Sequence, residues 1–468
     1  MQKIYLLLIV LICFTCTLQA QYEVKNINIL QPEVNIDHVK SSVQFWIDHA
    51  YDPIKGGFYS NIDQQGNKVQ LTNVRSPYQK YYRKSLVAQT RQGYGFTRAF
   101  MLTGDENYLM YAKSALDFLF QYGWDATNEG WYYFAKEDGS LDGDQWWNPN
   151  LTKVGFQQHY ALVGIVANYE ATRNPVVKGW MDKGISVLNN KMWDTRAGYE
   201  GYFENTANAT WATKSGKGFT CTVDAITTNA ELSYLVTQDV TKKERLLQLG
   251  DIIVKRLIPQ MDNAQVKVLY PESFTTDWTV SSYTADASVG HFLKTAWVLG
   301  RAYLCDTTKK EFKNAAIKIL DKAWSYDNGN GVTIWDKVNG GPFNNLKVST
   351  GGWGTNGDSK DYWTLEQGFM APMINYYITK NPLYLQMADD AILFYMTHFK
   401  DNTYGETYGL LDKTGTEIKN SNKGDDFKAN YHNVEFAYYA YLYSSLYYLH
   451  QPVSLYYKFE PSDNEQTI

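Results

Sequence analysis

The chain has 468 residues, of which 16% are aromatic, and its 44 basic and 49 acidic side chains give a net charge of −5. This composition excludes a disordered or collagen-like chain. The absence of long Lys/Arg runs argues against nucleic-acid binding, because contact with a phosphate backbone needs clustered positive charge. The many Tyr and Trp side chains need partners for their polar tips, so we expect a share of them to line a wet, concave surface that suits sugars.

Residues 1–20 have the pattern of a secretory signal peptide. Lys3 supplies a positive charge, residues 4–14 are apolar, and Ala20 is a small residue at the expected cleavage site. The apolar run is too short to span a bilayer, and no later segment is long and apolar enough to do so. We therefore predict export to the periplasm or the exterior. Lipoprotein anchoring through Cys16 is the weaker alternative, because the residues before it fit a lipoprotein signal poorly.

Removal of the leader would leave two cysteines, Cys221 and Cys305. In an oxidising compartment they form either a disulfide or two buried free thiols. Their spacing does not decide between these alternatives.

A short polar break between two apolar, helix-like stretches recurs along the chain at a spacing of about 70 residues. The apolar residues around each break follow helical spacing, as in Leu246, Leu249 and Ile253. Each unit is therefore predicted to be a helical hairpin. The breaks lie at residues 102–105, 171–174, 236–239, 304–306 and 378–381.

Gly- and aromatic-rich stretches follow the second helix of these units, and a similar stretch precedes the first break. They begin at Tyr51, Trp124, Trp193, Tyr326 and Phe399. This composition is typical of short β-hairpins. One such excursion per repeat would place them together at one end of the helix pairs.

Five or six helical hairpins that share one core close most economically into an α/α barrel. We therefore predict one all-α domain over residues 21–468, a barrel with β-hairpin excursions at one end. An open superhelix is the alternative, but its terminal units would need polar caps, and residues 434–449 are strongly aromatic.

Three histidines, His159, His291 and His432, stand in apolar, helix-like contexts flanked by aromatic residues. For each one alone, a hydrogen-bonded core histidine is the simpler interpretation. The chain has no zinc-binding spacing, no Gly-x-Ser-x-Gly elbow and no phosphate-binding Gly loop. We therefore predict no metal and no cofactor, and proton transfer is the chemistry left for these histidines.

The sequence resembles the N-acylglucosamine 2-epimerase and cellobiose 2-epimerase family from about Asp52 to Tyr438. The resemblance rests on several short motifs, in order and about one per repeat. They are Arg91 to Phe96 before the first break, Gly290-His291 with Trp297 beyond it, Gly340-Gly341 before Tyr362-Trp363, and Tyr431-His432.

The resemblance implies an (α/α)6 barrel with a central saccharide site. In that family two histidines act as general acid and base and invert a sugar carbon next to the carbonyl of the open-chain form. By position these are His291 and His432, with Arg91 near the carbonyl oxygen and Trp363 under the ring. Such chemistry needs a base whose pKa is near the working pH and a charge that holds the developing enolate oxygen.

We also place His159 and Tyr431 among the substrate-binding candidates.

The sequence departs from the family pattern at several positions. Lys294 replaces an acidic residue three positions after His291, Thr228 replaces a histidine, Glu435 replaces an arginine, and the Trp-Trp-x-Gln pattern reads Tyr362-Trp363-Thr364-Leu365 before Glu366.

Lys294 is expected on the same helix face as His291. It would favour neutral imidazole and could hold a carboxylate, which would suit an acidic sugar. A lysine whose amine extends to the barrel mouth is the other interpretation.

Three other functions remain open from the sequence. A polysaccharide lyase would remove the C5 proton of a uronic acid, with Tyr431 or Tyr283 available as a base, and export fits a polymer substrate. A glycoside hydrolase would need two carboxylates, with Asp224, Asp286 and Glu366 as candidates. A non-catalytic sugar-binding barrel would use the same aromatic residues. The sequence does not indicate an oligomeric state.

Overall fold

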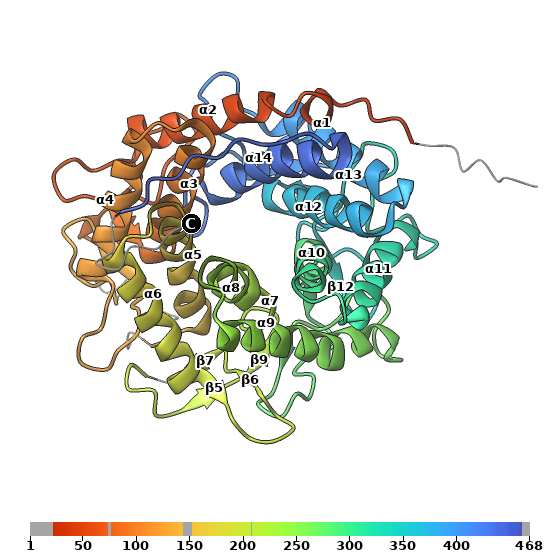
Figure 1. Ribbon diagram of the computed structural model, residues 1–468, viewed down its shortest axis with the longest axis horizontal. Helices are drawn as coiled ribbons and strands as arrows, with labels where there is room; N and C mark the ends of the chain where they lie inside the picture. The colour runs from red at the N-terminus through yellow and green to blue at the C-terminus, as the bar shows by residue number, and fades with distance from the viewer. Residues whose placement is uncertain (1–21, 74–75, 144–151, 207, 461–468) are drawn as a thin grey trace, which may run out of the picture.

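A computed structural model describes residues 22–460 except 74–75, 144–151 and 207. The predicted leader and Cys16 lie outside the described residues. Helices form two concentric layers around a central axis (Figure 1). The inner layer holds α3 (Leu86–Thr103), α5 (Gly155–Thr172), α7 (Val223–Ala225) with α8 (Glu231–Thr237), α10 (Val289–Cys305), α12 (Tyr362–Thr379) and α14 (Tyr431–Tyr443). The outer layer holds α2 (Val34–His49), α4 (Asn107–Tyr122), α6 (Pro175–Val187), α9 (Val240–Ile252), α11 (Lys310–Ser325) and α13 (Pro382–Phe394), and the short α1 (Ile27–Leu30) precedes it.

The five predicted polar breaks all connect an inner helix to the following outer helix, so the predicted repeat is confirmed. Their residue types explain the turns. Gly104 ends α3 with a φ of 75°, a left-handed conformation that suits glycine. Asn174 and Asn381 each cap the next helix through a side-chain oxygen, and a proline follows each of them at the first helical position.

The barrel closes by joining the two ends of the described chain. The inner helix α14 packs against α3, the first inner helix, and against α2, which comes before the first repeat. The sixth hairpin is thus made of the first long helix and the last one. The predicted (α/α)6-type barrel is confirmed, and the arrangement is closed instead of an open superhelix.

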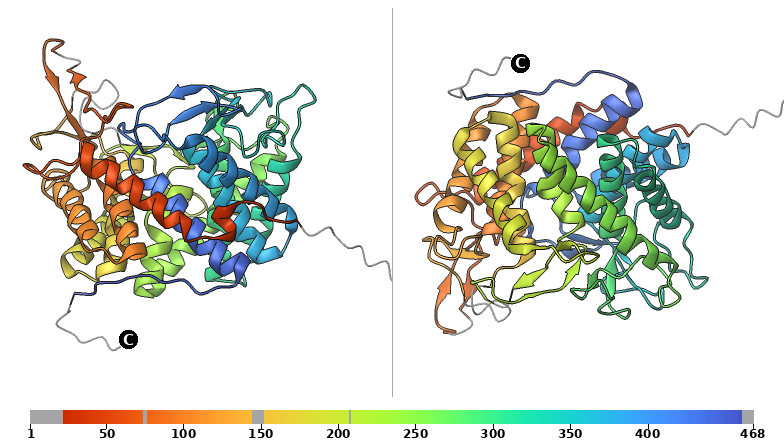
Figure 2. Two further views of the ribbon diagram at one scale, coloured as in Figure 1. Left: turned by 90° about the horizontal axis from the view of Figure 1, so that it is seen from above. Right: turned by 60° about the horizontal axis from the view of Figure 1, so that its bottom comes forward.

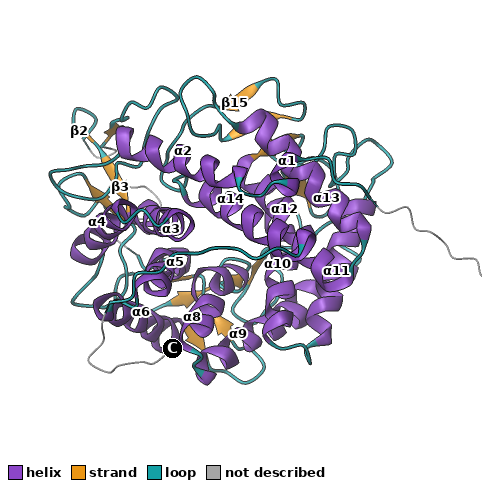
Figure 3. Ribbon diagram, turned by 45° about the horizontal axis from the view of Figure 1, so that its top comes forward, coloured by secondary structure: helices purple, strands orange, loops and turns teal. Residues whose placement is uncertain are grey.

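The strands are short and lie together at one end of the barrel (Figures 2 and 3). Each pairing is antiparallel. The pairs are β1 (Leu71–Thr72) with β2 (Lys80–Tyr81), β3 (Arg83–Ser85) with β4 (Phe134–Lys136), β5 (Trp193–Asp194) with β6 (Gly201–Tyr202), β7 (Asn205–Thr206) with β8 (Lys214–Ser215), β9 (Lys217–Gly218) with β10 (Ser273–Phe274), β11 (Asp286–Ser288) with β12 (Asn345–Lys347), and β13 (Ser359–Asp361) with β14 (Leu410–Asp412), which also pairs with β15 (Ile418–Asn420).

The predicted excursions follow one plan that the sequence did not reveal. Each contains a buried aspartate that accepts backbone N–H groups of its own turn and forms an ion pair with a buried lysine ahead of the next inner helix. We call these ion pairs the Asp–Lys clamps. They are Asp52–Lys84 at 2.7 Å, Asp125–Lys153 at 3.0 Å, Asp194–Lys217 at 2.7 Å, Asp336–Lys360 at 3.3 Å and Asp401–Lys423 at 2.8 Å.

The fourth excursion corrects one predicted start. The hairpin equivalent to the others begins at Trp335, which pairs with Pro342, and not at Tyr326. Its clamp aspartate is accordingly Asp336. Tyr326 ends α11 and belongs to an additional turn between the helix and the hairpin.

The end of the barrel opposite the hairpins is crossed by residues 451–460, which run in extended form (Figure 2). We call this segment the C-terminal strap. Its backbone N–H groups at Tyr456, Lys458 and Glu460 donate to Met101, Ala171 and Thr172 at the ends of α3 and α5.

Cys221 and Cys305 are free thiols, so the disulfide alternative is not realised in this structure.

Candidate active site

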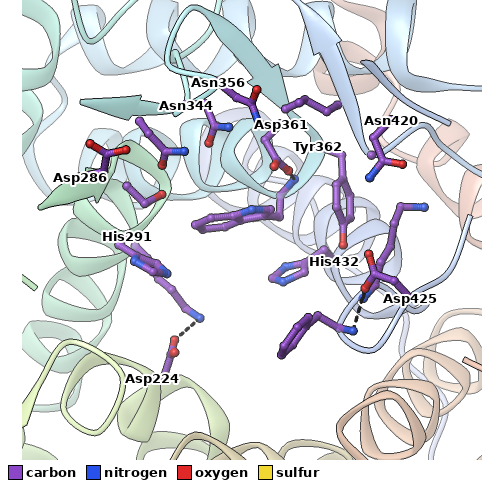
Figure 4. A pocket seen from close by; sticks show the side chains of 18 of the residues that line it. Asp224, Asp286, His291, Asn344, Asn356, Asp361, Tyr362, Asn420, Asp425 and His432 are labelled. Atoms are coloured by element: carbon purple, nitrogen blue, oxygen red, sulfur yellow. Dashed lines mark hydrogen bonds and ion pairs between the residues drawn. The ribbon is translucent and has the colours of Figure 1, made fainter. Parts of the chain in front are cut away.

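A cavity of about 640 Å³ opens at the hairpin end of the barrel, where the inner helices begin (Figure 4). Side chains from six inner helices, α3, α5, α7, α10, α12 and α14, line it, and loops of the hairpins form its rim. The residues that matter most to its chemistry are Arg91, Tyr160, Asp224, Glu272, His291, Lys294, Trp363 and His432. Five of the seven residues predicted to form the site therefore meet in one cavity.

His291 lies in the first turn of α10, at one side of the cavity. Its Nδ1 is 3.0 Å from Glu272 Oε2, and the other oxygen of this carboxylate accepts the backbone N–H of Ser288. The imidazole stacks on Phe219 with 3.9 Å between ring centroids. A carboxylate at Nδ1 favours the tautomer with its proton on Nδ1, which leaves the Nε2 lone pair for the cavity.

His432 faces His291 from the start of α14, across the cavity (Figure 4). Its Nδ1 is 2.6 Å from Glu366 Oε2 on α12. Burial lowers the pKa of His432 well below its ordinary value, and the nearby Arg91 and Lys294 lower it further. His432 is therefore neutral at physiological pH and is able to accept a proton at Nε2.

Trp363 lies between the two histidines. Its ring centroid is 5.2 Å from that of His291 and 6.0 Å from that of His432. The glycine before His291 makes room for it, because a Cβ at Gly290 would come within 2.4 Å of the indole. The Gly-His motif and the tryptophan are thus two parts of one packed wall.

Lys294 points into the same part of the barrel as His291, as predicted, but it is neither free nor extended to the mouth. Its Nζ donates to Asp224 Oδ1 at 2.6 Å and to the Tyr160 hydroxyl at 3.2 Å, and the side chain is buried. Burial alone would lower the pKa of Lys294, but the charge of Asp224 outweighs it and raises this pKa. The pair carries no net charge.

Two buried cations that line the cavity, Arg91 and Lys428, have no carboxylate ion pair among the described residues. The Lys428 amine donates to the carbonyls of Thr407 and Lys423. Arg91 is buried on α3, where it donates to the Phe427 carbonyl and lies over the rings of Tyr160 and Tyr431. Within the described ranges no carboxylate lies within ion-pair distance of Arg91, and its Nε has no hydrogen-bond partner. This uncompensated charge is suited to a developing oxyanion.

Two predicted site residues, His159 and Tyr431, do not line the cavity. His159 is fully buried behind its wall, with Nδ1 3.2 Å from the Asn229 amide, and burial lowers its pKa to about 3. Tyr431 is also fully buried, and its hydroxyl donates to Glu435 at 3.1 Å. Both side chains occupy the core because the helix turns them away from the cavity.

Sequence reasoning missed Glu272 and Tyr160 as site residues. Glu272 lies in the loop before α10, and no spacing rule connects it to His291. Tyr160 had a usable signal, because it lies next to His159 on a helix in which one neighbour faces the core and the other faces the cavity.

Glu366, His432 and Glu435 also form a compact buried group, with one nitrogen or oxygen from each within 4.8 Å of the others. These are residue types that hold metal ions. However, Glu366 and His432 contact each other at 2.6 Å, whereas two ligands of one ion, each about 2.0–2.2 Å from it, would be about 3 Å apart or more. The contact is a hydrogen bond.

The carboxylates proposed for glycoside hydrolysis are all engaged. Asp224 pairs with Lys294, and Glu366 bonds to His432. Asp286 accepts the backbone N–H and the hydroxyl of Thr355. A lyase would need a free cation for the uronate carboxylate, and the pairing of Lys294 removes the residue suggested for that role.

Comparison with known proteins decides the family. The sequence profile of N-acylglucosamine 2-epimerase matches residues 56–435, most of the chain. The chain belongs to this family. It is 21% identical to a D-mannose isomerase of Marinomonas mediterranea and to a cellobiose 2-epimerase of Bacteroides fragilis, covering 86% of this chain in both cases and 94% and 97% of the relatives. The structure of a cellobiose 2-epimerase from Spirochaeta thermophila shares the fold, with a TM-score of 0.71, 19% identity, and coverage of 89% and 97%.

As a member of the N-acylglucosamine 2-epimerase family, the protein is a sugar epimerase or isomerase. The family resemblance predicted from short motifs is confirmed, and the lyase alternative is not favoured. Among the described helices, none has the length and apolar character that a membrane span requires.

Proposed function

We propose that the protein moves a proton at the carbon next to the carbonyl of a neutral, open-chain sugar, with His291 and His432 as general base and acid. One observation carries this proposal. Both imidazoles line one cavity, and each has a glutamate at Nδ1 that leaves Nε2 as the proton-accepting atom. The same arrangement needs no metal or cofactor for proton abstraction.

The steps balance with these residues alone. One histidine takes the proton from C2, and the C–H electron pair forms the enediolate with its charge on the carbonyl oxygen, beside Arg91. If the other histidine returns a proton to the opposite face of C2, the product is the C2 epimer. If the proton of the O2 hydroxyl moves to O1 and a proton returns to C1 instead, the product is the ketose. The two named relatives represent these two outcomes.

The proposal of a neutral sugar replaces the acidic sugar that Lys294 suggested. Lys294 is bonded to Asp224 at 2.6 Å, so binding a substrate carboxylate would require breaking a buried ion pair. Arg91 matches one oxyanion. An acidic sugar would add a second negative charge, and the other buried cation of the lining, Lys428, already donates to the carbonyls of Thr407 and Lys423.

Substitution of each histidine tests the proposal. We expect His291→Ala and His432→Ala each to lower kcat by about 10²–10⁴-fold, with substrates such as mannose, cellobiose and N-acetylglucosamine followed by NMR in deuterated water. Deuterium at C2 of the epimer or at C1 of the ketose distinguishes the two reactions. His398→Ala, at an outer position away from the cavity, is the matched control. Full activity in both site variants would disprove the proposed roles.

We also propose that the mature chain is exported, on the strength of the N-terminal charge and apolar run. Amino-terminal sequencing of protein from the periplasm and the medium would test this. A mature terminus at or near Gln21 is expected. Recovery of the intact Met1 terminus from the cytoplasm alone would contradict export.

A further inference from the structure

Behind His432, two buried glutamates lie close together, and among the described residues neither forms an ion pair with a lysine or an arginine. Glu366 on α12 contacts the Nδ1 of His432, and Glu435 lies one turn after His432 on α14. Both side chains are almost fully buried, and Glu366, His432 and Glu435 each contribute an atom to the same compact group.

The hydrogen bonds around this pair leave one carboxylate oxygen of each glutamate without a partner. Glu366 Oε2 contacts His432 at 2.6 Å and Gln367 at 3.0 Å, and Glu435 Oε1 accepts the hydroxyls of Tyr94 and Tyr431, both at 3.1 Å. The remaining atoms, Glu366 Oε1 and Glu435 Oε2, are buried and have no other partner. Buried polar atoms are rarely left unpaired.

Ionisation of both carboxylates, which have oxygens within 4.8 Å of each other, is strongly disfavoured in a low-dielectric interior, because water does not screen their mutual repulsion. A single proton between the two unpaired oxygens satisfies both atoms and reduces the charge of the pair to −1. Burial and the neighbouring Glu435 raise the pKa of Glu366 well above its ordinary value, in agreement with this arrangement.

We propose that Glu435 is a positioning residue that shares one proton with Glu366 and thereby sets the proton affinity of His432. The shared proton moves part of the negative charge away from the oxygen that receives the His432 Nδ1–H. Neutral His432 is thereby preserved as a base. When His432 accepts the substrate proton at Nε2, the shared proton moves toward Glu435, and Glu366 becomes the full counter-ion of the imidazolium.

The charged and titratable groups that face this pair come from four elements. They are Arg91 and Tyr94 on α3, His291 and Lys294 on α10, Tyr395 directly after α13, and Tyr431 and Tyr439 on α14. All of them remain in the variants below, except that Tyr94 is itself replaced in one variant. The inference rests on the proposed role of His432 for its effect on activity, but the shared proton itself does not depend on that role.

Glu435→Gln is the decisive variant. Glutamine keeps the size and donates a hydrogen bond to Glu366, so Glu366 becomes a full carboxylate at neutral pH. We expect the acid limb of the pH profile of kcat/KM to move upward by roughly half a unit to one unit, because a stronger counter-ion favours protonated His432. An unmoved limb, or a shift to lower pH, would overturn the proposal.

Two further variants separate this role from a structural one. Tyr94→Phe removes one donor to Glu435 and should draw the shared proton toward Glu435, giving a smaller upward shift of the same limb. The Tyr94→Phe variant tests the proposal if Glu435→Gln does not fold. Glu231→Gln removes another buried carboxylate, the partner of Arg301 at 2.6 Å, and should lower stability without moving the limb. A limb shift in Glu231→Gln of the same size as in Glu435→Gln would overturn the proposal.

Infrared difference spectra test the proton without reference to activity. The wild type minus Glu435→Gln spectrum at pH 7 should contain the C=O band of a protonated carboxyl group, shifted in deuterated water. Its absence would overturn the inference, as would a stoichiometric metal ion found in the purified wild type by elemental analysis. If the band is present but His432→Ala is fully active, the shared proton stands and the proposed function fails.

Discussion

At the scale of single residues, the site depends on pairs whose members come from different helices. Lys294 on α10 and Asp224 on α7 form such a pair, and both side chains are buried. Removing one partner leaves an uncompensated charge in the interior. We therefore expect Asp224→Asn to lower the free energy of unfolding by about 3–5 kcal/mol, measured by urea denaturation.

The double variant Lys294→Met/Asp224→Leu is the control for this prediction. It removes both charges and should recover most of the stability, because well-packed apolar side chains can replace a buried ion pair. A double variant as unstable as Asp224→Asn would show that packing, and not charge, accounts for the loss.

The close packing of Gly290 against Trp363 leads to a prediction about catalytic efficiency. A methyl group at position 290 would meet the indole at 2.4 Å, so Gly290→Ala must displace the ring that lies between the two histidines. We expect kcat/KM to fall about 10²-fold, as is typical of a misplacement of about 1 Å. Gly179→Ala on α6, where no atom lies within 4 Å, should leave kcat/KM unchanged. Equal activity of the two variants would contradict this role of Gly290.

At the scale of elements, the five Asp–Lys clamps connect hairpins to the inner helices α3, α5, α7, α12 and α14, and they make the fold sensitive to acid. Burial alone would raise the pKa of Asp125, but the hydrogen bonds from Asn128 and the ion pair with Lys153 lower it to about 2. In the unfolded chain this pKa is about 4. The stabilisation is therefore complete above about pH 4 and is lost as the pH falls toward 2.

The variant Asp125→Asn tests the direction of this pH dependence. The free energy of unfolding of the wild type should exceed that of the variant at pH 7, and the difference should shrink as the pH falls from 4 to 2. Buried carboxyl groups whose pKa is raised, such as Glu204 and Asp361 at about 7, act in the opposite sense but are common to both proteins and cancel. A difference that grows in acid would contradict the clamp interpretation.

At the scale of the whole molecule, the barrel is closed at the end opposite the cavity by the C-terminal strap. Three backbone hydrogen bonds connect the strap to α3 and α5. We expect a chain that ends at His450 to lose about 3 kcal/mol of stability, since each such bond contributes about 1 kcal/mol. KM should stay the same, because the strap does not line the cavity. A tenfold change in KM would contradict this separation.

The repeat, the positions of the breaks between helices and, from these, the barrel could be predicted because they follow from local sequence. Polar breaks with Gly104, Asn174 and Asn381 determine where helices end and begin, whatever the rest of the chain does. His291 and His432 could be placed in the site because the motifs around them resemble a known family.

The partners of these residues could not be predicted. Asp224 is far from Lys294 in sequence, and Glu272 lies in an irregular loop, so only the closed barrel brings them into contact. The sequence also could not predict the direction in which the His159 side chain points. A helix that is apolar on all sides gives no sign of which histidine faces the cavity and which faces the core.

The inner helices all begin at the hairpin end, and this has an electrostatic consequence. Arg91, Tyr160, His291, Trp363 and His432 all fall within the first six residues of their helices. The start of an α-helix carries a partial positive charge, which is worth about 0.3–1 kcal/mol toward a nearby anion. Several such dipoles converge on one cavity here and would favour the enediolate of the proposed reaction over the uncharged sugar. In that reaction, part of the stabilisation would come from the backbone, where no side-chain substitution removes it.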